Sequence, residues 1–118
     1  MKNKEIVIPI LNDEYKVIVC WGSPKDIEKV IKDWHKDKAD VMLDSENTRG
    51  RCYYKKGCHP IIAMPSKPTT PEQIGTLAHE AVHAINNIFD MISEYQRDEL
   101  FAHSVGAVVR NTLKVTKK

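Results

Sequence analysis

Residues 70–89 read TPEQIGTLAHEAVHAINNIF, and this stretch predicts the helix around which the rest of the chain folds. Thr70, Pro71 and Gln73 have the form of a capping box with proline at the first helical position, so we expect the helix to begin here. Apolar residues then recur at helical spacing on one broad face, which predicts a largely buried core helix. The residues of this face are Ile74, Leu77, Ala78, Ala81, Val82, Ile85, Ile88 and Phe89.

A β-hairpin and a helix are predicted at the start of the chain. Residues 5–11 and 14–20 are rich in β-branched residues and are separated by Asn12-Asp13, a pair favoured in tight turns. Pro9 cannot donate to a strand ladder, so the first strand should lie at a sheet edge or carry a bulge. Ser23-Pro24 then offers an N-cap and a first-turn proline for an amphipathic helix over residues 24–36.

A second hairpin precedes the core helix, and a last helix follows it. Residues 51–54 and 59–64 flank a Lys-Lys-Gly turn. The segment 93–96 resembles another capping box, and apolar periodicity continues to about Leu113. This order predicts one α+β domain over residues 1–118, with a small mixed or antiparallel sheet packed on the core helix and on the C-terminal helix.

Composition excludes several classes of function. The net charge of +2 comes from 18 basic and 16 acidic side chains without a basic stripe, so we expect no nucleic-acid partner. No apolar run approaches the roughly 20 residues of a membrane helix, so we expect no membrane partner. Three cysteines without a CxxC pair, together with no signal segment at the N-terminus, favour a cytoplasmic location.

The motif that carries chemistry lies inside the core helix. His79 and His83 are four residues apart, so their imidazoles stand on one helix face and can bind a common ion. Glu80 lies about 100° around the helix, where its carboxylate can reach a water at the ion rather than the ion itself. HExxH on a helix therefore predicts one Zn²⁺ per chain held by the two histidines, with Glu80 as the general base.

A catalytic zinc site needs a third protein ligand, which the last helix can supply. An antiparallel return of the chain would bring Asp98, Glu99 and His103 beside the two histidines. Glu99 is the preferred ligand, and His103 is the alternative, because these two residues lie four apart on one face. Whichever of them does not ligate, or Asp98, could hydrogen-bond to the ligands from outside.

These residues resemble a known family. His79-Glu80-Ala81-Val82-His83, followed by Asp98-Glu99-Leu100-Phe101-Ala102, is similar to the small gluzincin-type zincins that occur as phage and prophage proteins. In gluzincins an HExxH motif is followed by ExxA, which Glu99 and Ala102 match. The resemblance implies a minimal zincin fold, a metallopeptidase activity and Glu99 as third zinc ligand. It also implies that the strand before the active-site helix, residues 59–64, is the edge along which a peptide lies.

Two functions are compatible with the motif. The first is a zinc metallopeptidase that cleaves a protein or peptide substrate, with Tyr95 or His103 as the donor to the developing oxyanion. The second is a zinc-stabilised module without turnover, which binds a protein partner by strand addition. Glu80 distinguishes them, because a purely structural zinc site does not require that carboxylate.

Overall fold

The computed structural model describes residues 5–10, 14–35, 50–55, 58–89 and 97–116, and of residues 97–100 the backbone alone. The elements follow the order β1 (Glu5–Ile10), β2 (Tyr15–Trp21), α1 (Pro24–His35), β3 (Arg51–Tyr53), β4 (Ile61–Met64), α2 (Pro71–Phe89) and α3 (Arg97–Thr116). The described part of the chain is therefore an α+β fold with a four-stranded mixed sheet and three helices, as expected. The radius of gyration is 13.5 Å, the value of about 13.5 Å that a compact domain of this length should have.

The sheet has the strand order β1-β2-β4-β3. The outer pairs are antiparallel, with Glu5 opposite Cys20 in one and Cys52 opposite Ile62 in the other. The central pair, β2 and β4, is parallel. Both predicted hairpins are therefore confirmed as strand pairs, and β1, which contains Pro9, lies at an edge as expected.

One prediction about the sheet is wrong. Residues 59–64 were expected to form the edge strand, but β4 lies inside the sheet and pairs on both sides. The edge beside the core helix is β3, which is only three residues long. The four residues of β4 are all buried. An unbroken apolar run of this kind is typical of a strand covered on both faces rather than of an edge strand.

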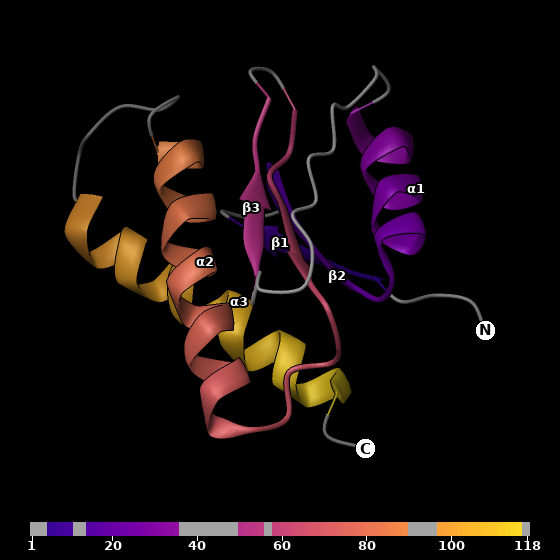
Figure 1. Ribbon diagram of the computed structural model, residues 1–118. Helices are drawn as coiled ribbons and strands as arrows, with labels where there is room; N and C mark the ends of the chain where they lie inside the picture. Colours follow the sequence, from indigo (N-terminus) through magenta and orange to yellow (C-terminus); the bar gives the residue numbers. More distant parts are fainter. Residues whose placement is uncertain (1–4, 11–13, 36–49, 56–57, 90–96, 117–118) are drawn as a thin grey trace.

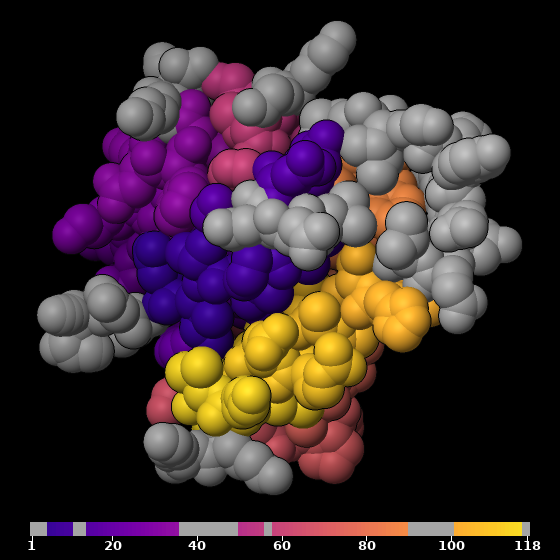
Figure 2. All heavy atoms as spheres, turned by 180° about the vertical axis from the view of Figure 1, so that it is seen from behind, coloured from indigo at the N-terminus to yellow at the C-terminus, as the bar shows by residue number. Residues whose placement is uncertain are grey.

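The helices cover both faces of the sheet, with α2 and α3 on one face and α1 on the other (Figure 1). Alternation along β2 explains this arrangement, because successive side chains point to opposite faces. Val17 and Val19 join the core beneath α2 and α3, whereas Ile18 and Cys20 join the cluster beneath α1. Seen from behind, α3 lies along β1 (Figure 2).

Local signals placed the starts of α1 and α2 correctly. Thr70 Oγ1 accepts a hydrogen bond from Gln73 N at 3.2 Å, and Gln73 Oε1 accepts one from Thr70 N at 3.1 Å. Ser23 and Asp26 exchange the same pair of bonds at the start of α1. The capping box predicted at 93–96 lies outside the described residues. The last helix runs three residues beyond the predicted end at Leu113, and Thr116 is still buried.

The buried face of α2 is narrower than predicted. Seven of its residues are buried, and the six apolar ones belong to the core that α2 forms with the sheet and α3. Val82, which was assigned to this face, is 43% exposed. It lies beside the two histidines on the outer side of the helix, because residues 79, 82 and 83 share one face at 3.6 residues per turn. The solvent-facing strip of α2 therefore contains His79, Val82 and His83.

Candidate metal centre

His79 and His83 lie together on the exposed face of α2. Their ring centroids are 4.9 Å apart, and the ring planes meet at 79°. Residues at i and i+4 of a helix are neighbours on its surface, so the sequence spacing alone accounts for this contact. Two imidazoles side by side and open to solvent are donors of the kind that zinc takes. These two histidines therefore fit two positions of a zinc site.

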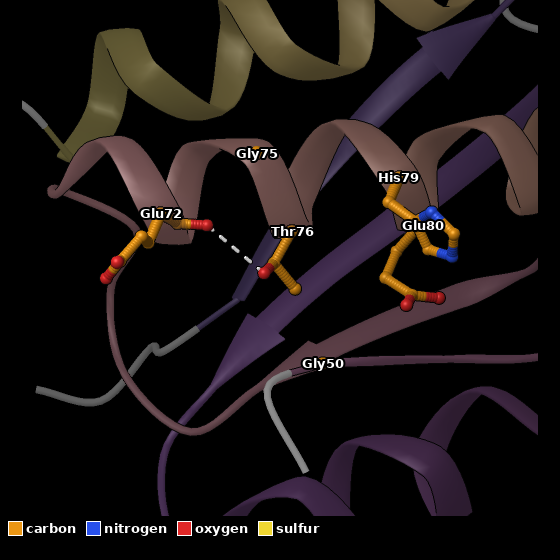
Figure 3. Close-up of a pocket in the computed structure, with 6 residues that line it drawn as sticks. All are labelled: Gly50, Glu72, Gly75, Thr76, His79 and Glu80. Atoms are coloured by element: carbon orange, nitrogen blue, oxygen red, sulfur yellow. Dashed lines mark hydrogen bonds between the residues drawn. The ribbon is translucent and has the colours of Figure 1, made fainter.

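Glu80 lies on the same helix as the two histidines but, unlike them, is buried. The residue is 9% exposed, although glutamate is seldom buried without a partner. None of the described residues forms a hydrogen bond or an ion pair with its carboxylate. Figure 3 shows the side chain extending from α2 toward the chain that follows Gly50, with the His79 ring beside it. The carboxylate is thus held next to the histidines without a described neutralising partner.

A solvent-open pocket of about 360 Å³ lies between α2 and the chain that enters β3. It is lined by Gly50, Glu72, Gly75, Thr76, His79 and Glu80 (Figure 3). A Cβ added at Gly50 would stand 2.7 Å from Thr76 Cγ2 and 3.5 Å from Glu80 Cγ, so only glycine permits this approach of strand to helix. At Gly75, which also lines the pocket, an added Cβ would meet nothing within 4 Å.

Cys52 is a neighbour of Glu80 that was not anticipated. Burial and, to a smaller extent, the negative charge of Glu80 together raise the pKa of the Cys52 thiol to about 12. The residue lies on β3 and packs against the core beneath α2. No local signal could have revealed its position beside Glu80, because that depends on how β3 meets α2.

The third ligand is expected on α3, which packs against α2. The rings of Phe89 and Phe101 meet edge to face with centroids 5.6 Å apart, so the first turns of α3 lie against the last turn of α2. The backbone of Asp98 and Glu99 belongs to this part of α3, but their side chains lie outside the described residues, as does all of Tyr95. Glu99 as third ligand therefore stays a prediction.

His103, the alternative ligand, is exposed on α3. Among the side chains that the structure describes, no three histidine, cysteine, aspartate or glutamate residues are grouped closely enough to hold a metal ion. The described arrangement thus brings together His79, His83 and Glu80, and does not add His103 to them.

Comparisons of this chain with protein-family models, with curated proteins and with solved structures find no match in any of the three. Within the described ranges, no helix is both long enough and apolar enough to cross a membrane.

Proposed function

We propose that this chain is a zinc-dependent metallopeptidase of the zincin type, acting on a protein or peptide substrate. The observation that carries the proposal is the burial of Glu80 beside two solvent-facing histidines on the same helix. This carboxylate is not needed to hold the ion, because the two histidines and one further side chain would serve as its protein ligands. A zinc site that served only to stabilise the fold would not require Glu80 beside the two histidines.

In this proposal His79, His83 and Glu99 would hold one zinc ion. Bound zinc supplies a Lewis acid that polarises a carbonyl and makes a water more acidic. Glu80 would act as the general base, accepting a proton at a carboxylate oxygen and passing it on to the leaving amine. The position of Glu80 favours this role, because Glu80 lines the same pocket as His79, the first of the two histidines.

The substrate would lie along β3 rather than along residues 59–64. β3 is the strand that borders the pocket, and its pairing within the described residues is with β4 alone. An extended peptide could therefore add to its outer edge by main-chain hydrogen bonds. Gly50, just before β3, lines the same pocket as Glu80, so a peptide on this edge would lie near that carboxylate.

The test combines zinc content with peptide cleavage. We expect about one zinc per chain in protein purified without chelator, and almost none in His83→Ala. Glu80→Gln should keep its zinc while cleavage of a peptide library, read by mass spectrometry, falls by about 10²–10⁴-fold. Glu72→Gln is the matched control, because Glu72 lines the same pocket from the same helix but is exposed, and it should keep both zinc and activity.

Three results would count against the proposal. A parent protein that cannot be loaded with zinc would make the motif an accident of sequence. If the Glu80→Gln variant still cleaves peptides, Glu80 is not the general base. The zinc-stabilised binding module would be favoured by a third result. In that case the zinc-loaded parent cleaves no member of the library, and zinc stabilises the parent and Glu80→Gln equally.

A further inference from the structure

A second histidine cluster lies on the α1 side of the sheet, away from the candidate metal centre. It joins the end of α1, the start of β2 and the chain entering β4. His35 Nε2 donates to His59 O at 2.8 Å, and Lys16 N donates to His59 Nδ1 at 3.3 Å. The Trp34 and His59 rings also meet edge to face with centroids 6.1 Å apart.

The His59 ring takes the place of a main-chain acceptor. In a parallel pair, alternate amides of one strand point toward its neighbour, and here Ile18 N donates to Pro60 O at 3.0 Å. Lys16 lies two residues earlier and its amide points the same way, but the acceptor it meets is the imidazole nitrogen of His59. The β2–β4 ladder is therefore extended by one hydrogen bond whose acceptor can be protonated.

We propose that protonation of His59 opens this junction, so that the cluster is a pH-sensitive clasp between α1, β2 and β4. An imidazolium has two N–H donors and no acceptor, so a proton on Nδ1 abolishes the bond from Lys16 N. The bond from His35 to His59 O does not change, because a main-chain carbonyl does not titrate in this range. Only one of the two contacts is therefore switchable.

Burial and the positively charged groups around His59 act in the same direction. Burial lowers the pKa of the His59 imidazole from its ordinary value, and the positive charges of Lys16 on β2 and His35 on α1 lower it further. Glu5 on β1 is the acidic group of the cluster, and its carboxylate accepts a hydrogen bond from Trp34 Nε1 at 3.4 Å. The folded chain thus binds this proton more weakly than the unfolded chain does.

The sign of the pH effect follows from that difference. A histidine whose pKa is lowered by folding adds stability that is fully present above its ordinary pKa of about 6.5. As pH falls through the window between that value and the lower folded pKa, the unfolded chain takes up the proton first and stability is lost. One such group can raise the unfolding equilibrium constant by at most about tenfold per pH unit.

The opening would reach the strand beside the candidate metal centre. Ile61, two residues after His59, pairs with Ile18 of β2 and with Tyr53 of β3. Loss of the bond at His59 therefore loosens the end of the strand that holds β3 in the sheet. This inference rests on the described contacts of His59 and is independent of the proposed peptidase activity.

The experiment compares the full chain with His59→Asn between pH 7 and 5, at equal metal content. Asparagine Oδ1 occupies the position of His59 Nδ1 and accepts a hydrogen bond without titrating. The unfolding equilibrium constant of the wild type should increase as pH falls. In His59→Asn this increase should be smaller, by a factor of up to about ten for each pH unit. His35→Gln is the control, since glutamine Nε2 can replace the donor to His59 O, and it should keep the larger part of the wild-type slope.

Nuclear magnetic resonance on wild type keeps the test decisive even if a variant fails to fold. The His59 ring should titrate with a midpoint below about 6.5. As pH is lowered, the Lys16 amide should lose more of its protection from hydrogen exchange than the Ile18 amide, whose acceptor is a carbonyl. A midpoint at or above the ordinary value, equal pH dependence of the two amides, or equal slopes for wild type and His59→Asn would overturn the clasp.

Discussion

Buried polar side chains in this protein differ in whether a described partner meets them. Glu80 has none among the described residues, which we attribute to its proposed role in catalysis. Two threonines of α3 provide a comparison with no functional role attached. Thr116 Oγ1 donates to Thr112 O at 3.1 Å, whereas Thr112 Oγ1 is buried and meets no hydrogen-bond partner in the described part of the chain.

We predict opposite effects of removing these two hydroxyls. Thr112→Val removes a buried hydroxyl that makes no described bond, so the free energy of unfolding should stay equal or rise by up to about 1 kcal/mol. Thr116→Val breaks the hydrogen bond of a threonine that is also buried, so it should lower the free energy of unfolding by about 1 kcal/mol. Urea unfolding of the two variants beside the parent measures both values, and a larger loss in Thr112→Val than in Thr116→Val would contradict this assignment.

The cysteines should differ in reactivity for a related reason. Burial raises the pKa of both Cys20 and Cys52 to about 12, with the charges of Glu5 and Glu80 adding to the respective shifts. Both thiols therefore stay protonated at pH 8, and the thiolate is the reactive form. Iodoacetamide should modify Cys58, which is half-buried in a bend, well before the other two, as followed by peptide mass spectrometry. Rapid labelling of Cys52 in the folded protein would show that its thiol is not packed against the core beneath α2.

At the scale of elements, the contact of α2 with the chain entering β3 depends on Gly50. No L-side chain fits there without movement, because an added Cβ would lie 2.7 Å from Thr76 Cγ2. Thr76 is held in place by the hydrogen bond from its Oγ1 to Glu72 O at 3.2 Å (Figure 3). The same helix contains Gly75, where an added Cβ meets nothing within 4 Å.

These two glycines make a matched pair of predictions. Gly50→Ala should lower the free energy of unfolding by about 1–3 kcal/mol through overpacking. Adding Thr76→Ser, which removes Cγ2 but keeps the hydroxyl, should restore part of the loss. Gly75→Ala should instead raise stability by up to about 1 kcal/mol, because alanine favours the helix. Thermal or urea unfolding tests all three, and equal costs at Gly50 and Gly75 would mean that the strand does not approach α2 this closely.

At the scale of the whole molecule, the proposed zinc site should be linked to folding. A ligand that binds only the native chain stabilises it by about 2.7 kcal/mol at a free concentration one hundred times its dissociation constant. We therefore expect zinc to raise the unfolding midpoint of the parent and a chelator to lower it again. His83→Ala should show neither effect, and zinc stabilisation of equal size in that variant would place the ion elsewhere.

Much of this architecture follows from local chemistry that can be read in the chain. The starts of α1 and α2 were predicted correctly, because their capping bonds join residues three apart. The contact between His79 and His83 was predicted for the same reason, since four residues make about one helical turn. The α+β class and the two strand pairs also followed from periodicity and turn residues.

Only the folded chain decided which strand forms the edge and what surrounds each site residue. β4 pairs on both sides, β3 borders the pocket, and Glu80 lies buried beside Cys52. In the same way His59 meets an amide 43 residues earlier in the chain. These features depend on strand order and on packing between distant segments, which local propensity does not encode. The sequence therefore specified the reactive groups, and tertiary packing determined their exposure and their neighbours.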